Sequence, residues 1–373
     1  MNIVITGDLL PTPNNERLFC NGDAKTLVGK EILNIFQNAD FRICNMEGPL
    51  TDEETAIDKS GPAIKGSSNA IKGIKALGMD CVSIANNHIL DYGEQGLEDT
   101  FRVLAESGID YVGAGRNLLE AKKPYIVERE GIRIGIYSCA EYEFTIATDA
   151  KGGANPFDAL EIADEIRKLK EQCDIAIVLY HGGKEFYRYP VPYVQKRCRK
   201  MADAGADFVL CQHSHCIGTY EEYNGCNILY GQGNFLFCRA DDEYRHTGMI
   251  VRITVSNGRK NMEFIPVVRH DETVRLADTS EKKEIMDGFL ERSEKAKNND
   301  FLKKNYREFA LSCVFIYYKN NMGLLGELWC RFRLSRFMLR LFRPRHHLWL
   351  LNEIRCEAHA DIFREGIEGI LEK

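Results

Sequence analysis

The feature that most constrains the fold is a regular alternation of short apolar segments and amphipathic segments over residues 1–255. The apolar segments are rich in β-branched residues and almost continuously hydrophobic, which is typical of strands buried on both faces. Strands are predicted at residues 3–6, 41–45, 81–85, 111–112, 132–138, 175–180, 208–211, 227–230 and 249–255. Amphipathic helices are predicted at residues 69–77, 93–107, 156–172 and 192–204. This order predicts a layered α/β domain in which helices cover a sheet.

The character of the chain changes after about residue 270. Residues 279–308 are rich in Lys, Glu and Asn, as solvated helices are, and residues 348–372 have the pattern of a further amphipathic helix. We therefore divide the chain into an α/β domain, residues 1–274, and a helical C-terminal region, residues 275–373.

An arginine-rich stretch lies within the C-terminal region. Residues 329–347 contain six arginines and no acidic residue, and Phe, Leu and Met interleave with the arginines. A basic amphipathic helix of this kind can lie on an anionic membrane surface, which makes peripheral membrane contact one interpretation. The other is an ordinary surface helix that packs its apolar residues in the core, and we favour it because such helices are common.

Charge and composition exclude some classes of partner. The formal net charge is −6. A protein with this charge would need a local basic patch to bind nucleic acid, so we predict no nucleic-acid partner. The first residues have no signal-peptide pattern, and the sequence contains no run of about 18 apolar residues that would span a membrane. The 13 cysteines form no Cys-x-x-Cys pair, and several lie in apolar strand runs, as reduced core thiols do. We therefore expect a cytoplasmic protein.

Short polar blocks follow five of the predicted strands. In open α/β folds, sites are built at the carboxyl ends of strands. The Asp, Asn, Glu and His side chains of these blocks are the ligand types of a metal-dependent hydrolytic site. The blocks are Gly7-Asp8, Asn45-Met46-Glu47, Asn86-Asn87-His88, His181-Gly182-Gly183 and Gln212-His213-Ser214-His215.

Each block also has an ordinary structural explanation. Asp8 has the position of a turn or N-cap aspartate, and a lone His181 at a strand end is often a satisfied structural residue. The blocks at 86–88 and 212–215 are more specific. Two asparagines and a histidine in a row are costly to place near a core without a partner, and histidines two residues apart can face one metal. Asp91 follows at a distance that lets it orient His88.

Further polar residues near these blocks are candidates for the same site. Glu185 and Tyr187 come soon after His181 and are expected to line its pocket. Asn234 lies in the glycine-rich turn at 231–235, which can offer backbone amides to an anion. Cys211 and Cys216 flank the histidine pair, so a Cys/His zinc site is a less favoured alternative.

The order of the blocks resembles the CapA-type proteins of bacterial capsule and poly-γ-glutamate synthesis, a branch of the calcineurin-like metallophosphoesterase superfamily. The resemblance covers roughly residues 3–240. It implies an α/β fold with a four-layer α/β/β/α sandwich and a helical C-terminal extension. The stretches that carry it are TGDLL, NMEGPLT, GMDCVSIANNHILDYGEQGLEDT, YVGAGRNL, LYHGGKEFYRYP, AGADFVLCQHSHCIGTYEEYNG and ILYGQGNFLF.

The resemblance also implies which residues form the site. The cofactor would be one or two divalent ions, Mn, Fe or Zn. The wider superfamily usually has a histidine two residues after its first aspartate, and here that position is Leu10. It also usually has Gly-Asp-x-x-Asp where this chain has Asn45-x-Glu47. The predicted metal ligands are Asp8, Glu47, Asn87, His181, His213 and His215. The predicted catalytic residues are His88, Glu47 and Asp91, and the predicted substrate-binding residues are Asn45, Asn86, Glu185, Tyr187 and Asn234.

Together these features predict a metal-dependent hydrolase linked to capsule or poly-γ-glutamate metabolism. Its substrate would be a phosphoester or a γ-glutamyl amide in a small molecule, an anionic polymer or a peptide. Two alternatives stay open. One is a noncatalytic component that binds an envelope polymer, and the other is metal-assisted proton transfer on a peptide, as in an epimerase.

Overall fold

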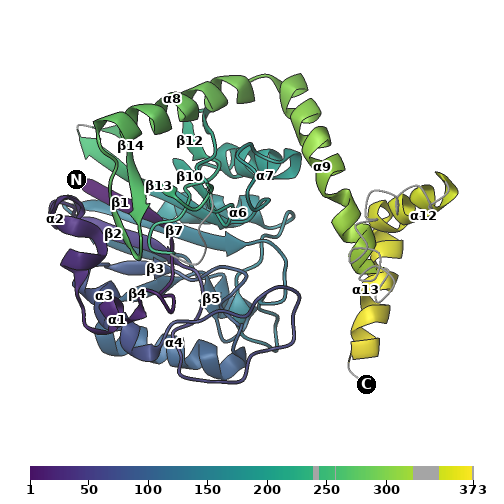
Figure 1. The fold of residues 1–373 in the computed structure, drawn as a ribbon, viewed down its shortest axis with the longest axis horizontal. Helices are drawn as coiled ribbons and strands as arrows, with labels where there is room; N and C mark the ends of the chain where they lie inside the picture. The colour runs from purple at the N-terminus through teal and green to yellow at the C-terminus, as the bar shows by residue number, and fades with distance from the viewer. Residues whose placement is uncertain (238–242, 257, 322–343, 372–373) are drawn as a thin grey trace. The chain divides into compact units, whose positions relative to one another are not determined.

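Two β-sheets form the centre of the first structural unit, which spans residues 1–302 (Figure 1). The computed structural model describes residues 1–237, 243–256, 258–321 and 344–371. The larger sheet has seven strands, in the order β15 (Thr273–Leu276), β14 (Arg259–His270), β13 (Thr247–Ser256), β1 (Asn2–Leu9), β2 (Phe41–Met46), β3 (Cys81–Ser83) and β4 (Asp110–Val112). Strands β1 to β4 are parallel, whereas β13, β14 and β15 pair antiparallel.

The second sheet has six strands and a parallel centre. Its order is β11 (Tyr220–Tyr223), β12 (Cys226–Leu229), β10 (Phe208–Gln212), β9 (Ile175–His181), β7 (Ile132–Ala140) and β6 (Tyr125–Arg129). The edge strands β11 and β6 pair antiparallel with their neighbours. A separate two-stranded sheet joins β5 (Ala114–Gly115) to β8 (Gly153–Ala154).

The two large sheets face each other across one apolar core. Ile3, Ile5 and Ile43 of the first sheet share a buried cluster with Ile177 and Leu210 of the second. Because both faces of the central strands are covered, these strands read as continuous apolar runs rather than alternating ones.

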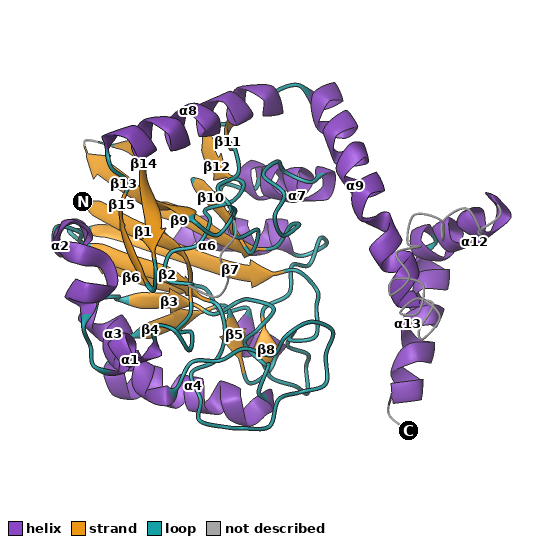
Figure 2. Cartoon of the chain, in the orientation of Figure 1, coloured by secondary structure: helices purple, strands orange, loops and turns teal. Residues whose placement is uncertain are grey.

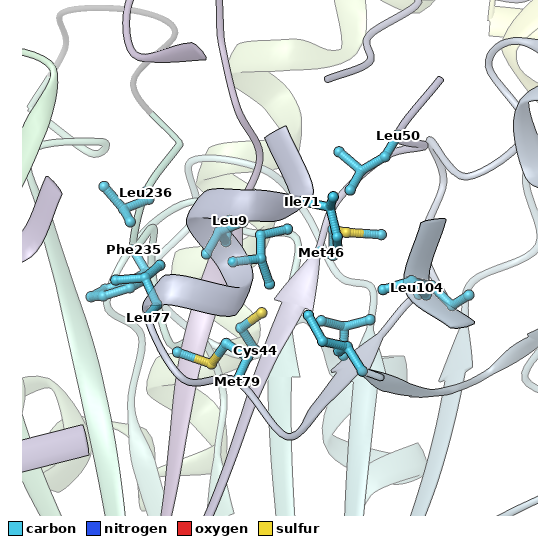
Figure 3. Packing of buried hydrophobic residues seen from close by; sticks show 14 of the residues in the cluster. Leu9, Cys44, Met46, Leu50, Ile71, Leu77, Met79, Leu104, Phe235 and Leu236 are labelled. Carbon is cyan, nitrogen blue, oxygen red and sulfur yellow. The ribbon is translucent and has the colours of Figure 1, made fainter. Parts of the chain in front are cut away.

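Helices cover the outer face of each sheet (Figure 2). On the seven-stranded sheet, Cys44 and Met46 of β2 pack with Ile71, Leu77 and other residues of the helical layer (Figure 3). That layer contains α1 (Glu16–Cys20), α2 (Ala24–Gln37), η1 (Ser68–Ala70), α3 (Ile71–Ala76) and α4 (Gly93–Ser107). The six-stranded sheet is covered by α6 (Ile162–Gln172) and α7 (Pro192–Asp203), and a short α5 (Leu118–Ala121) precedes β6. The four-layer α/β/β/α sandwich expected from the sequence is therefore confirmed.

Helix α8 (Thr279–Ala296), which the sequence assigned to the helical C-terminal region, packs on the sandwich. Its Phe289 joins the core between the sheets and meets Phe264 with ring centroids 4.9 Å apart. Ser293 Oγ accepts a hydrogen bond of 2.9 Å from the Tyr220 amide. The first unit consequently ends at Leu302, later than the boundary at 274 that we drew from the sequence.

The second unit, residues 303–373, is helical in its described part. Its elements are the remainder of α9 (Asn299–Asn321), then α12 (Pro344–Arg355) and α13 (Glu357–Leu371). Residues 329–343 of the arginine-rich stretch lie outside the described residues, so its membrane contact stays a prediction. Every helix in the described ranges is too short or too polar to cross a lipid bilayer.

Several elements differ from those predicted from the sequence. Helix α2 was not predicted, although its buried residues Ala24, Val28 and Ile32 recur at helical spacing; a glycine, Gly29 at φ 72°, interrupts its backbone. Strand β14 was missed because it is only partly buried and mixes polar with apolar residues. Helix α6 begins at Ile162, later than the predicted start at residue 156.

Gly7 allows a close backbone approach that shapes strand β1. A β-bulge lies between Thr6 and Asp8, and a Cβ on Gly7 would lie 2.0 Å from the carbonyl oxygen of Gly233. We expect Gly7→Ala to lower the free energy of unfolding by about 3 kcal/mol, because a backbone atom cannot yield as a side chain does. Urea denaturation measures this change.

The matched control is Gly369→Ala in α13, where an added Cβ would meet no atom within 4 Å. We expect this variant to be as stable as the unaltered protein or slightly more so. Equal stability of the two alanine variants would contradict the close approach.

Candidate metal centre

The carboxyl ends of five parallel strands meet at one edge of the sandwich. Strands β1, β2 and β3 come from the seven-stranded sheet, and β9 and β10 come from the six-stranded sheet. The polar side chains that follow them are at most 8% exposed. The residues that this arrangement brings together are Asp8, Asn45, Glu47, Asn87, His181, His213 and His215.

Asn45 connects the two sheets at this edge. The bulge in β1 places Asp8 opposite Asn45, and Asn45 Nδ2 donates a hydrogen bond of 2.8 Å to Asp8 Oδ1. The same nitrogen lies 3.2 Å from His181 Nδ1, at the end of β9. Asn45 therefore orients one carboxylate and one imidazole, and it is not among the described residues that line the pocket beside His88 and His215.

Two groups of ligand-type atoms share Glu47. One group is Glu47, His181 and His213, and the other is Asp8, Glu47 and His215; within each group the atoms lie within 4.8 Å of one another. Glu47 Oε1 is 3.7 Å from both His181 Nε2 and His215 Nε2. A carboxylate with this placement could serve as a ligand in either group.

Asn87 adds an oxygen to the first group. Its Oδ1 lies 3.0 Å from His181 Nε2, and His181 Nε2 lies 3.1 Å from His213 Nδ1. Amide oxygen, carboxylate oxygen and imidazole nitrogen together form a mixed donor set that suits Mn, Fe or Zn.

Glu47 indicates that the residues fit a cation. Its side chain is 0% exposed, and neither carboxylate oxygen has a hydrogen-bond partner among the described residues. Burial and the neighbouring Asp8 raise the pKa of Glu47 well above its usual range. A buried carboxylate without a partner is unfavourable, and a positive ion between the two groups would remove that penalty.

The surroundings shift the pKa values of the three histidines in different directions. Burial, reinforced by neighbouring histidines, lowers the pKa of His181 and of His213, which favours their neutral rings. Burial also acts to lower the pKa of His215, but Glu47 and Asp8 outweigh it and raise that pKa to about 9. A positive charge at His215 is therefore stabilised by the same carboxylates that would hold an ion.

The backbone around the histidine pair is strained. His213 has φ 89° and His215 has φ 53°, backbone angles that residues other than glycine rarely adopt. Such strain is concentrated at functional sites, where surrounding structure holds it in place. Asn234 provides part of that support, because its Oδ1 lies 2.9 Å from His215 Nδ1.

His88 lies beside the two groups of ligand-type atoms and contacts the ion pair of Asp91 and Lys59. Its Nδ1 is 2.6 Å from Asp91 Oδ2, and the other oxygen of Asp91 is 2.5 Å from Lys59 Nζ. Burial lowers the pKa of His88, and the opposing influence of Asp91 is too small to restore it. Lys59 was not predicted from the sequence, because it lies in segment 51–66, which has neither the hydrophobic pattern of a strand nor that of a helix.

A pocket of about 360 Å³ opens beside the histidines. Glu185, predicted to bind substrate, lines it, as do Glu143 and Arg245, which the sequence analysis did not select. The lining also includes Lys59, Asn87, His88 and His215.

Three residues predicted to bind substrate have other contacts. Asn86 is buried, its Nδ2 donates to the Met46 carbonyl, and its Oδ1 accepts from the His88 amide. Tyr187 is buried against Tyr189, with ring centroids 6.1 Å apart, and Asn234 lies behind His215. None of these three is among the described residues that line the pocket of about 360 Å³, and their role in substrate binding stays a prediction.

The family of the chain follows from its sequence. Residues 2–239 match the family described as "Bacterial capsule synthesis protein PGA_cap". The chain belongs to this family.

Curated relatives of known name share the matched region. The PGA biosynthesis protein CapA of Bacillus subtilis is 30% identical over 64% of this chain and 64% of its own length. The capsule biosynthesis protein CapA of Bacillus anthracis is 28% identical over 62% of this chain and 58% of its own length. The chain thus spans less than two thirds of the length of these relatives.

Similarity to solved structures is more distant. A phosphatase from Mycoplasma pneumoniae superposes with a TM-score of 0.46 at 18% identity, covering 73% of this chain and 94% of that one. The layered fold described above therefore rests on the strands and helices of this chain alone.

We expect Glu47→Gln to stabilise the protein in a chelator and to abolish its stabilisation by Mn²⁺. The substitution removes a buried carboxylate whose oxygens lack hydrogen bonds, which we expect to raise the free energy of unfolding of the metal-free form by on the order of 1 kcal/mol. Thermal melts with EDTA and with Mn²⁺ measure both effects.

The pH dependence of this difference has a defined sign. An acid whose pKa is raised on folding binds a proton more tightly in the folded state, so metal-free wild-type protein gains stability as the pH falls. The advantage of Glu47→Gln should be largest at neutral pH and should shrink as the pH approaches the ordinary range of a glutamate. Glu263→Gln, at a partly exposed ion pair with Arg252, is the control and should show neither effect.

Proposed function

We propose that this protein is a metal-dependent hydrolase that uses two divalent ions. Its substrate class would be a phosphoester or a γ-glutamyl amide, carried by a small molecule, an anionic polymer or a peptide in capsule or poly-γ-glutamate metabolism. The observation that carries the proposal is the buried carboxylate of Glu47, which has no hydrogen-bond partner among the described residues and belongs to two groups of ligand atoms at once.

The residues divide between two ion sites. Asp8, Glu47 and His215 would hold one ion, whereas Glu47, Asn87, His181 and His213 would hold the other. Ions bound there would polarise the scissile group and lower the pKa of water. Leu10 offers no donor to the first site, which leaves that site with fewer protein ligands than the second.

His88 is placed to move a proton at the edge of the pocket. Because Nδ1 faces Asp91, Nε2 lies on the opposite side of the ring. Asp91 stabilises the protonated ring, so His88 can hold a proton and release it from Nε2 to a leaving group. The lowered pKa makes that release easier at neutral pH.

The substrate class rests on kinship and on the charges of the pocket. The similar proteins from the two Bacillus species are named for PGA and capsule biosynthesis. The pocket holds the cations Lys59 and Arg245 together with the carboxylates of Glu143 and Glu185. A substrate with both anionic and amide or amine groups matches this mixture better than a simple apolar ester does.

Removing either histidine of the pair tests the metal assignment. We expect His213→Ala and His215→Ala each to weaken Mn²⁺ binding at least about 10–100-fold, because each removes one imidazole from a small ligand set. Bound metal is measured by elemental analysis after dialysis. Hydrolysis is measured with bis-p-nitrophenyl phosphate and with γ-glutamyl-p-nitroanilide.

The control is His270→Ala, because His270 is exposed at the end of β14 and should leave both readouts unchanged. Unchanged metal content and turnover in the two site variants would end the assignment. Binding of poly-γ-glutamate that survives chelation, without turnover, would instead identify a noncatalytic polymer-binding protein. Deuterium uptake into an unhydrolysed peptide would identify proton transfer.

Replacing His88 separates proton transfer from metal binding. We expect His88→Asn to reduce kcat about 10²–10³-fold while the bound metal content stays the same, because His88 belongs to neither ligand group. Steady-state kinetics on a metal-loaded sample test this. A parallel loss of metal would instead indicate that His88 is a ligand.

A further inference from the structure

The segment 51–66, between β2 and η1, is fastened to Asp91 by three hydrogen bonds. The Ile57 amide donates to the Asp91 carbonyl over 2.9 Å, and the Ile64 amide donates to Oδ2 over 2.8 Å. Lys59 Nζ donates to Oδ1 over 2.5 Å. One aspartate thus organises a loop that has no regular secondary structure of its own.

Lys59 also contacts the residues that precede Asp91. Its Nζ donates a hydrogen bond of 3.0 Å to the Asn87 carbonyl and lies 3.4 Å from His88 Nδ1. The Lys59 side chain is only 3% exposed. An ammonium group that has left water needs several acceptors, and here they come from the two ends of the segment 87–91.

We propose that Lys59 is a positioning residue for the metal centre and for His88. Its ammonium group would link the Asn87 carbonyl to the Asp91 carboxylate. This link would fix the positions of the Asn87 side chain and the His88 ring relative to each other. This inference rests on the proposed function, because the Asn87 oxygen it holds is assigned there to the second ion site.

The contacts of Asn87 explain why a tie at its backbone matters. Its Oδ1 is 3.0 Å from His181 Nε2. Its Nδ2 donates a long hydrogen bond of 3.5 Å to Glu143 Oε2. The side chain is thus held weakly at its amino end. The direction in which Oδ1 points depends on where the backbone of Asn87 is held, and Lys59 holds it.

A purely structural role for Lys59 predicts something different. A buried ion pair can often be replaced by neutral residues with little loss of stability, provided that both charges are removed together. If Lys59 only balanced the charge of Asp91, the double variant Lys59→Met/Asp91→Asn would bind metal as the unaltered protein does. If Lys59 positions Asn87, the double variant still lacks the tie to the carbonyl.

The test compares Lys59→Met with Lys65→Met in the full-length chain. Lys65 lies in the same segment, but its ammonium contacts the Glu53 carbonyl and stands 4.6 Å from the centre of the Tyr92 ring. We expect Lys59→Met to weaken Mn²⁺ binding about 10-fold at one of two sites in a calorimetric titration, and Lys65→Met to leave both sites unchanged. Mn²⁺ alone is the ligand.

A second readout needs no metal. Hydrogen–deuterium exchange of a peptide covering residues 84–92, measured in EDTA, should be faster in Lys59→Met than in the unaltered protein or in Lys65→Met. The double variant leaves no unpaired buried charge, so it provides the folded sample if the single variant unfolds. It should keep both the weaker Mn²⁺ binding and the faster exchange.

The outcomes separate this inference from the function on which it rests. Two Mn²⁺ ions bound equally well by the unaltered protein, Lys59→Met and the double variant, with equal exchange, would overturn the role of Lys59 and leave the hydrolase proposal standing. No Mn²⁺ bound by the unaltered protein would overturn the metal centre, and the exchange data would still decide whether Lys59 holds the segment.

Discussion

The structure of the site depends on a buried carboxylate that has no hydrogen-bond partner among the described residues. Glu47 lies where the strand ends of two facing sheets meet, and its oxygens lack hydrogen bonds within the part of the chain that the structure describes. Such a group is unfavourable in a low-dielectric interior unless positive charge reaches it. Other ligand-type groups lie close to Glu47. They are the neighbouring imidazoles, the carboxylate of Asp8 and the amide oxygen of Asn87, and that positive charge would be placed among them.

Two residues next to this carboxylate have an unusual backbone conformation. His213 and His215 have positive φ, as do Glu130, Phe186, Asn224 and Asp271 elsewhere in the described part of the chain. Close by, Gly7 lets β1 approach the Gly233 carbonyl more closely than any side chain would permit. Departures from local rules are expected at functional sites, and the two histidines fit that expectation. The two hydrophobic cores, one between the sheets and one beneath α2 to α4, supply the stability that tolerates this geometry.

The sequence predicted much of this arrangement for identifiable reasons. Parallel strands buried on both faces have continuous apolar runs, so β1, β2, β9 and β10 were visible, and polar blocks at their ends marked the site. Partly exposed strands such as β14 lack that pattern and were missed. Among the site residues, Asp8, Glu47 and His213 were visible because each lies at the carboxyl end of a strand or directly after it. Lys59 and Arg245 were not predicted, because each lies in a segment without a periodic pattern of hydrophobic residues.

The sequence by itself determined the layered α/β class, the family and the set of ligand-type side chains. These depend on local pattern and residue type, which are properties of the chain alone. Only the tertiary structure decided that Glu47 is shared by two ligand groups, that Asn45 joins the two sheets, and that Lys59 contacts Asn87 and Asp91. Such contacts join residues far apart along the chain. Their geometry is set by how the sheets and the loop 51–66 pack, and no local pattern encodes that packing.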